Sequence, residues 1–478
     1  MSRRPSSFTQ IPAHFLPFSE AASDDLPMGQ LLRLSLFQVS VGMATVTLLG
    51  TLNRVMIVEL GVAATIVALM IALPVLIAPF RALLGFRSDT YRSAIGWKRI
   101  PYLWFGSIWQ MGGLAVMPFA LLVLSGHSTI DVPFAGEALA AIAFLMAGLG
   151  IHMTQTAGLA LACDRASEAT RPKVVALLYV MYLIGMGVSA LVVGWLLRDF
   201  SDLRLIRVVQ GVATVGMILN LIALWRQEKV RPMTAAERMA PRPSFGDAWA
   251  DLLKGGQAGR LLAVVFLGTM AFNMQDVLLE PYGGEVLGLS VSSTTLLTAM
   301  WVVGALAGYG LAARLLGQGH DPARLACGGV LAGVVAFSAV IFSAPMSAPL
   351  LFFAGAGVIG FGGGLFAVAT LISAMNLPEQ GLAGKGLALG AWGAAQATAS
   401  GLTIALGGSL RDIVDVQAQS GALGAALNTA TTGYSFVYHV EIGLLFITLI
   451  ALGPLAAHRR NTTTPTNTTQ SGLPEFPT

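Results

Sequence analysis

Long apolar runs alternate with short polar breaks along most of this chain. Each run has about twenty residues, the length that a helix needs to cross the hydrocarbon core of a membrane. A longer polar break near residues 226–260 divides the runs into two sets of six. The runs lie near residues 33–55, 60–84, 101–125, 138–162, 173–197, 205–226, 261–280, 291–316, 323–343, 348–375, 384–408 and 436–457. This pattern predicts an all-α membrane protein with twelve transmembrane helices in two six-helix halves.

The composition excludes an ordinary soluble protein. Hydrophobic residues make up 55% of the chain and charged residues 11%, with a mean hydropathy of +0.73, whereas soluble domains have about 25% charged residues. The 55 glycines fit helices that pack closely within a membrane. With only Cys163 and Cys327, no disulfide framework is expected. The net charge of +4 belongs to the loops, so no nucleic-acid partner is expected.

The distribution of basic residues predicts the orientation in the membrane. With both termini inside, 23 of the 28 Lys and Arg residues fall in cytoplasmic segments, as the positive-inside rule requires. We therefore expect a cytoplasmic N-terminal segment (1–32), an N-terminal half (33–226), a cytoplasmic linker (227–260), a C-terminal half (261–458) and a disordered cytoplasmic tail (459–478).

Two local patterns are typical of the major facilitator fold. The motif Gly85-x-x-x-Asp89, followed by Gly96-x-Lys-Arg, resembles the loop that joins helices two and three in major facilitator transporters. The segment Gly194-Trp-Leu-Leu-Arg-Asp199 recurs as Gly407-Gly-Ser-Leu-Arg-Asp412, in each case after the fifth run of a half. Repeated six-helix halves with a central cavity at their interface are how this fold is built.

Charged residues at the cytoplasmic junctions indicate structural or gating groups. Asp89 can accept hydrogen bonds from helix N-terminal amides or pair with Arg92 or Arg99. Arg81 lies in the same basic stretch, and Asp164 belongs to a second charged junction. A direct substrate role would require this stretch to face the cavity, which we do not expect.

A polar cluster is expected at the outer ends of the first and seventh runs. Arg54 and Glu59 flank the first outer turn, and Asp276 and Glu280 lie at the equivalent place in the second half. We favour a structural or gating ion pair between Arg54 and one of these carboxylates. A substrate site is the alternative.

His152 stands alone in the middle of the fourth run, where a polar side chain is costly and marks a function by default. Neutral imidazole is a common metal ligand, so His152 is a candidate ligand for the central magnesium of a chlorophyll-type ring. The alternative is a histidine that hydrogen-bonds between helices. The glycine-rich stretch 355–364 indicates either close helix packing or a wall for a large flat ligand. The sequence has no enzyme motif and no cluster with zinc spacing, so we expect neither catalysis nor a structural metal.

Three passages resemble the PucC/LhaA family of photosynthetic purple bacteria. They are Gly50-Thr-Leu-Asn-Arg-Val-Met-Ile-Val-Glu-Leu60, Ala78-Pro-Phe-Arg-Ala-Leu-Leu-Gly-Phe-Arg-Ser-Asp89 and Gly96-Trp-Lys-Arg-Ile-Pro-Tyr-Leu-Trp-Phe-Gly106. The passages Phe15-Leu-Pro-Phe-Ser-Glu20 and Leu26-Pro-Met-Gly-Gln-Leu-Leu-Arg-Leu-Ser35 are more similar to the LhaA branch, which serves light-harvesting complex 1.

This resemblance implies a non-enzymatic assembly factor with the major facilitator fold. Its expected ligand is bacteriochlorophyll or a late precursor, bound non-covalently. The expected partners are the light-harvesting antenna α and β polypeptides, together with the pigment-synthesis and membrane-insertion machinery. The expected location is the bacterial inner (intracytoplasmic) membrane.

A secondary transporter of a small amphipathic solute is the alternative function. Proton-coupled transporters usually place carboxylates in the middle of their spans, and none is expected there in this chain. His439 and Glu441 stand at the outer start of the last run and are expected to be interfacial. This pattern disfavours an ion-driven pump.

Overall fold

In a computed structural model, the elements of the described residues are all helices. The structure describes residues 21–23, 26–52, 55, 56, 67, 69, 70, 73, 74, 77–91, 93, 96–124, 134–197, 201–228, 234, 239, 243–254, 256–289, 291–377, 384–429 and 431–462.

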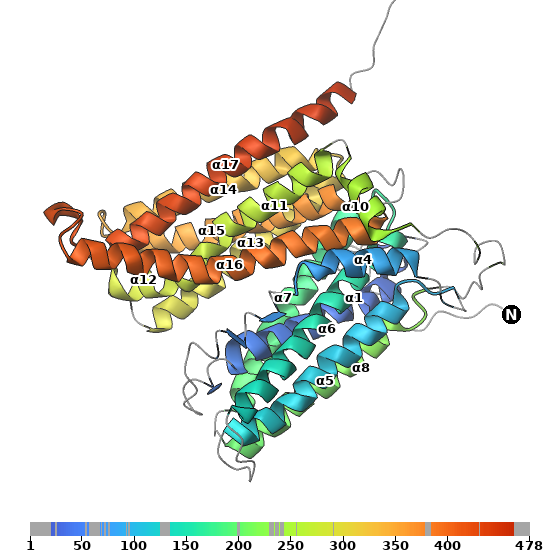
Figure 1. Cartoon of the computed structure of the whole chain (residues 1–478). Helices are drawn as coiled ribbons and strands as arrows, with labels where there is room; N and C mark the ends of the chain where they lie inside the picture. Colours follow the sequence, from blue (N-terminus) through green and yellow to red (C-terminus); the bar gives the residue numbers. More distant parts are fainter. Residues whose placement is uncertain are drawn as a thin grey trace, which may run out of the picture.

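The helices lie in two groups that follow the order of the chain (Figure 1). The first group contains α1 (Met28–Val46), η4 (Thr47–Leu52), α4 (Phe80–Thr90), α5 (Ile100–Leu124), α6 (Ala135–Arg165), α7 (Arg171–Leu196) and α8 (Asp202–Leu224). The second group contains α10 (Phe245–Leu253), α11 (Gln257–Asn273), η5 (Met274–Val277), α12 (Leu279–Glu285), α13 (Val291–Gly317), α14 (Pro322–Ser343), α15 (Pro349–Met375), α16 (Lys385–Gln419), η6 (Ala425–Leu427) and α17 (Thr432–Thr462).

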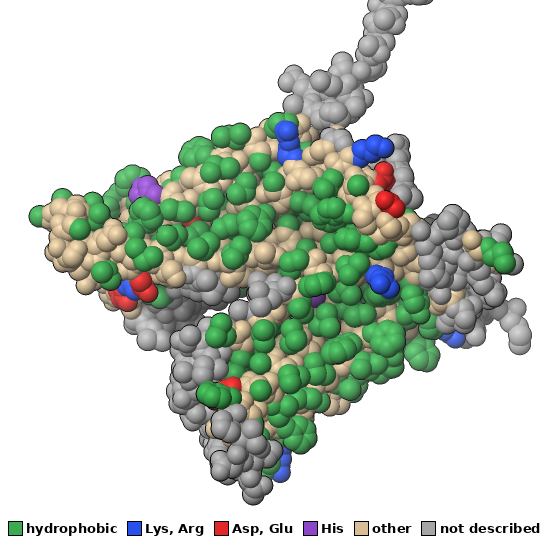
Figure 2. Space-filling model, in the orientation of Figure 1, with side chains coloured by type: hydrophobic (Ala, Val, Ile, Leu, Met, Phe, Trp, Pro, Cys, Tyr) green, Lys and Arg blue, Asp and Glu red, His purple; other side chains and the backbone are tan. Residues whose placement is uncertain are grey.

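Ten of the described helical segments are long and apolar enough to cross a membrane. Large apolar side chains point outward from them: Leu191 is 77% exposed, Val335 66% and Ile450 76%. Such a surface is favourable in lipid and costly in water. Figure 2 shows hydrophobic side chains along the flanks of both helix groups, with most visible charges near the ends. The chain is therefore a multi-pass membrane protein.

The predicted run at 60–84 lies largely outside the described residues, so the count of twelve spans stays a prediction. Helix α16, which is rich in small residues, is not among the ten apolar segments. The seventh run differs from a simple helix, because α11 ends at Asn273 and continues through the 3₁₀ turn η5 into α12.

The two groups of helices meet where α4 packs on α16. A Cβ atom on Gly85 would collide with the carbonyl oxygen of Gly386, and one on Gly390 would collide with the carbonyl oxygen of Arg81. The two backbones are therefore in direct contact, which only glycine permits. Further along the interface, the rings of Tyr179 from α7 and Tyr309 from α13 stack with centroids 5.1 Å apart.

The stretch 355–364 serves helix packing. A Cβ atom on Gly360 would collide with the carbonyl oxygen of Trp301 in α13, and one on Gly362 would lie 2.6 Å from the carbonyl oxygen of Gly329 in α14. These glycines hold α15 close to both neighbours. None of them lines the cavity described below, so the packing interpretation is the correct one.

The linker between the groups contains a short amphipathic helix. Ser244 caps α10, because its hydroxyl accepts a hydrogen bond from the backbone N–H of Asp247 at 3.0 Å. Ala248 and Leu252 are buried in a cluster with Phe86 of α4 and Ala391 of α16. The linker thus packs against both groups at the place where they meet.

Candidate functional site

A cavity of about 310 Å³ lies between the two groups of helices. Helices α1, α4, α6 and α7 line one side, and α16 lines the other. Its walls are mainly apolar, with a few polar groups among them. These polar groups are Gln38, Thr45, Arg81, His152, Gln155, Tyr179, Tyr182, Gln396 and Ser400.

His152 lies on the cavity wall, in the middle of α6. Its Nε2 atom is 3.0 Å from the carbonyl oxygen of Pro74. A carbonyl can only accept, so Nε2 carries the hydrogen, and in the neutral ring Nδ1 holds the lone pair. Nδ1 is buried and has no hydrogen-bond partner among the residues that the structure describes. The imidazole therefore fixes a neighbouring segment with one nitrogen and keeps the other available as a ligand.

Arg81 also lines the cavity, which corrects the expectation that this stretch would face away from it. The side chain is 2% exposed. Its Nε donates to Thr156 Oγ1 at 3.1 Å, its Nη1 to the carbonyl oxygen of Gly393 at 3.3 Å, and its Nη2 to Gln155 Oε1 at 3.1 Å. All three acceptors are neutral.

Two further polar side chains on the cavity wall escaped the sequence analysis. Gln38 Oε1 and the hydroxyl of Tyr179 are both buried, and neither has a hydrogen-bond partner in the described part of the chain. Buried polar atoms are nearly always paired, so unpaired ones around one cavity suggest a ligand. Gln38 could have been noticed in the sequence as a lone amide within an apolar run.

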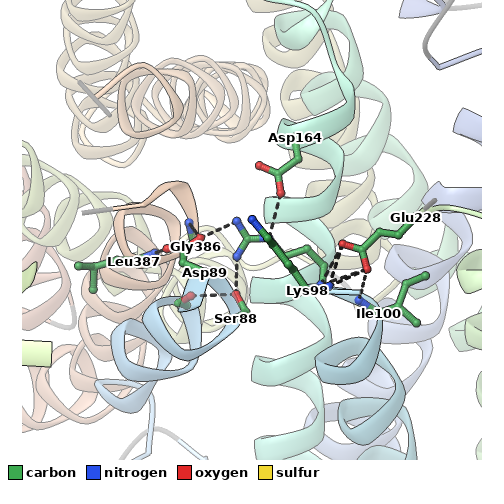
Figure 3. Close-up of polar contacts among 10 residues, drawn as sticks. Ser88, Asp89, Lys98, Ile100, Asp164, Glu228, Gly386 and Leu387 are labelled. Carbon is green, nitrogen blue, oxygen red and sulfur yellow. Dashed lines mark hydrogen bonds and ion pairs between the residues drawn. The ribbon is translucent and has the colours of Figure 1, made fainter. Parts of the chain in front are cut away.

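Arg99 organises a polar network at the junction of the two groups (Figure 3). Its guanidinium lies 2.5 Å from Asp89 Oδ1 and 2.9 Å from Asp164 Oδ2, and is 4% exposed. Burial, the largest influence, lowers the pKa of Arg99, but the two carboxylates together raise it above the ordinary value. The predicted structural role of Asp89, Arg99 and Asp164 is consistent with these contacts.

Asp89 also connects the two groups directly. Its Oδ1 accepts from the backbone N–H of Gly386 at 2.9 Å, and its Oδ2 accepts from that of Leu387 at 2.8 Å. Both amides lie in the first turn of α16, where the helix dipole favours a carboxylate. Figure 3 shows Asp89 pointing toward this turn. A second link joins Arg171 Nη1 to Asn376 Oδ1 at 2.9 Å.

Glu228 is a part of this network that the sequence analysis missed. Its carboxylate accepts from the backbone N–H groups of Lys98, Arg99 and Ile100 at 3.2, 3.1 and 3.0 Å. It thereby caps the start of α5 from the end of the first group, 128 residues away from Ile100 in the sequence. Local capping patterns do not reveal a partner so distant.

The predicted outer ion pair falls mostly outside the described residues. Arg54 and Glu59 are not described, and only the backbone of Glu280 is. Asp276 is exposed and accepts a hydrogen bond from Gln275 Nε2. The pairing of Arg54 therefore stays a prediction.

A different ion-pair cluster joins the end of α12, the last turns of α16 and the start of α17. Arg411 Nη2 lies 2.7 Å from Glu285 Oε2, and Arg411 Nε lies 2.9 Å from Asp415 Oδ2. The Tyr434 hydroxyl donates to the same Glu285 oxygen at 2.8 Å, and its ring lies under the guanidinium, 4.6 Å away. Arg411 belongs to the repeated segment found in the sequence, so one copy of that repeat joins three helices.

Glu441, which was expected to be interfacial, is enclosed by protein. It lies more than two turns inside α17 and is completely buried. Neither carboxyl oxygen makes a hydrogen bond of normal geometry with the described residues. A fully buried carboxylate in this helix was not anticipated from the sequence. The predicted run began at residue 436, whereas α17 begins at Thr432.

The family model described as PUCC protein matches residues 51–460. This chain belongs to that family. A PucC protein of Cereibacter sphaeroides is 49% identical over 95% of this chain and 98% of its own length. A Rhodobacter capsulatus protein described as an uncharacterized protein in the puhA-bchM intergenic region is 62% identical over 97% of both chains. A bacteriochlorophyll synthase 44.5 kDa chain of the same species is 29% identical over 80% of this chain and 88% of its own.

The fold of this PUCC family member is similar to that of solved transporter structures. A crystal structure of a bacterial homologue of the iron transporter ferroportin, in an outward-facing state, matches with a TM-score of 0.70. It covers 90% of this chain and 99% of the other, at 12% identity. At this identity the likeness shows the fold alone. The predicted fold class is thus confirmed in its coarse form.

In their chemistry, the residues of the cavity are suitable ligands for the magnesium of a chlorophyll-type ring. Nδ1 of His152 has a lone pair that could bind a metal and no hydrogen-bond partner among the described residues. Most of the surrounding wall is apolar. In size, the cavity of about 310 Å³ is at the lower end of the range of about 300–1,000 Å³ for small-molecule sites. It therefore has room for part of such a pigment.

Proposed function

We propose that this protein is an assembly factor for a photosynthetic light-harvesting complex, light-harvesting complex 1 in particular. It binds bacteriochlorophyll or a late precursor in the cavity and delivers it within the membrane to the antenna α and β polypeptides. Membership of the PUCC family and the printed names of the relatives support this proposal. The single observation that carries it is the unpaired Nδ1 of His152 beside an apolar cavity.

In this proposal each part of the cavity has a distinct task. His152 would hold the magnesium of the pigment, and its hydrogen bond to Pro74 keeps the ring in the required tautomer. The bound pigment would supply only a coordination site and a large flat apolar surface. Tyr179 and Gln38 would contact polar groups at the ring edge, since each has an unpaired atom. Apolar walls exclude water from the ring.

The proposed arrangement in the cell follows from the charge distribution. Twelve spans in two six-helix halves cross the inner membrane, with both termini and the linker 227–260 in the cytoplasm. The end at which α4, α10 and α16 meet is then cytoplasmic and closed. No catalytic step is proposed, and the handover to the antenna polypeptides occurs between membrane helices.

The test is the colour of the purified protein. Parent and His152→Leu are expressed in a pigment-making host and purified in mild detergent, and bacteriochlorophyll is measured per polypeptide. We expect the parent to retain pigment and His152→Leu to lose most of it, because the magnesium ligand is gone. The matched control is His439→Leu, which removes an exposed histidine whose ring is likewise bonded to a backbone carbonyl.

Size-exclusion profiles and melting curves establish that both variants fold. Equal pigment in His152→Leu and the parent, with an unchanged absorption band, would remove His152 from the proposed role. A colourless parent would argue against pigment binding altogether.

One observation favours a second candidate, a secondary transporter of a small amphipathic solute. Glu441 supplies the buried carboxyl group that ion-coupled transport would use and that the sequence did not lead us to expect. The colour experiment separates the two functions, because a solute transporter would be purified without pigment.

A further inference from the structure

Arg81 and Arg99 are both buried arginines, but their surroundings differ in charge. Arg99 is balanced by Asp89 and Asp164 at hydrogen-bond distance. Arg81 contacts only neutral acceptors, namely Thr156, Gln155 and the carbonyl oxygen of Gly393. No carboxylate among the described residues pairs with Arg81. Within the part of the chain that the structure describes, the cavity wall therefore carries a positive charge at Arg81 without a counter-ion.

Such a charge is costly to keep inside a protein. An arginine side chain stays protonated under practically all conditions, and a buried ion without a counter-ion is strongly destabilising. The three observed hydrogen bonds use three of its five N–H groups, which leaves one on each terminal nitrogen. Two such N–H groups are the donors that a carboxylate accepts in a bidentate pair.

The position of Arg81 shows what would supply the missing negative charge. Its side chain and that of His152 line the same cavity. Gln155, which accepts from Arg81, lies one helical turn after His152 on α6. A ligand held at His152 would therefore bring its nearest edge groups to Arg81.

We infer that the cavity takes an amphipathic ligand that bears a carboxylate, and that this carboxylate pairs with Arg81. This choice of ligand rests on the proposed function: the ligand is the free acid of the pigment, in which the propionate on the ring edge is not yet esterified. An esterified pigment presents no negative charge there and leaves Arg81 unbalanced. A long-chain fatty acid would offer the same carboxylate from a lipid source.

The first experiment changes the ligand and leaves the protein intact. The purified full-length protein is titrated with the free acid of the pigment and with its methyl ester, and binding is followed by the absorption band. A charge-assisted pair should make the acid bind about tenfold tighter or more. Equal affinity for acid and ester would overturn the inference while leaving pigment binding intact.

The second experiment changes Arg81. Arg81→Met should reduce the acid-to-ester ratio to about one, chiefly by weakening the acid. Arg81→Lys keeps the charge and should retain part of the preference, because a lysine is a point charge without the bidentate geometry. If Arg81→Met keeps the full preference, another group recognises the carboxylate and the inference is wrong.

A fatty acid separates this inference from the proposed function. Binding of neither pigment form, together with no Arg81-dependent binding of a long-chain fatty acid, would overturn both. If the fatty acid alone binds, and loses affinity in Arg81→Met, the carboxylate site stands and the pigment function falls. The comparison of acid and ester affinities uses only the parent protein, so it tests the inference even if the Arg81 variants fold poorly.

Discussion

The sequence identified some of the important residues because they are rare in their surroundings. A lone histidine in an apolar run directed attention to His152, which does line the cavity. Arg81 was predicted to be a structural or gating residue of a basic stretch that faces away from the cavity, and its place on the cavity wall depends on how α4 meets α16. Gln38 and Tyr179 carry no motif, so only their unpaired atoms reveal them. A residue type can thus be noticed in a sequence, but the partners it lacks can be seen only in a structure.

Glu441 leads to a stability prediction. Replacing it with Met keeps the length of the side chain and removes a buried carboxyl group that makes no hydrogen bond of normal geometry with the described residues. We expect Glu441→Met to raise the free energy of unfolding by about 1–3 kcal/mol, the cost of an unsatisfied buried polar group. Melting curves in detergent, followed by tryptophan fluorescence, measure the change.

The matched control for Glu441→Met is Glu285→Met. Glu285 is half-exposed, pairs with Arg411 and accepts from Tyr434, so its replacement should lower the melting temperature. A lower melting temperature for Glu441→Met than for Glu285→Met would mean that Glu441 has a stabilising partner.

At the scale of helices, hydropathy located most elements well. The predicted runs 101–125, 173–197, 323–343 and 348–375 correspond closely to α5, α7, α14 and α15. The length of an apolar run does not predict the end of a helix that continues into polar sequence, as α16 does through Arg411 to Gln419. Pairing of helices was not predictable either. Gly85 and Gly386 are two of 55 glycines, and nothing in their local sequence shows that they touch.

The contact of α4 with α16 predicts a large effect of Asp89→Asn. The amide would keep the size of the side chain but lose the charge that balances Arg99 and accepts two α16 amides. Breaking a buried pair costs about 3 kcal/mol or more. We therefore expect a clearly lower melting temperature and lower accumulation in the membrane.

The same substitution at Asp412 is the control for Asp89→Asn. Asp412 pairs with Arg411 at 3.0 Å, but its side chain is 69% exposed, and exposed pairs contribute about 1 kcal/mol or less. If Asp89→Asn melts no earlier than Asp412→Asn, the link between the two helix groups does not depend on this carboxylate.

At the scale of the whole molecule, fold class was the most predictable property. A repeated pattern of apolar runs and a charged loop between the second and third runs are enough to indicate the major facilitator fold, and the solved structure confirms the likeness at 12% identity. The cavity was less predictable, because it forms where α1, α6 and α7 face α16, far apart in the sequence. Its position depends on close contact between α4 and α16, which only the assembled helices reveal.

Orientation in the membrane gives the last prediction. The 23 basic residues assigned to the inner side include seven in the stretch 226–260, and moving so many charges across the membrane is strongly disfavoured. Alkaline phosphatase, which is active only outside the cytoplasm, is inserted into the full chain at Thr234 and, in a second construction, at Gly421 in the turn between α16 and α17. We expect no activity at Thr234 and full activity at Gly421, with equal amounts of both proteins on immunoblots. Activity at Thr234 would reverse the orientation and place the Asp89 and Arg99 network on the outer side, so that the cavity would open toward the cytoplasm.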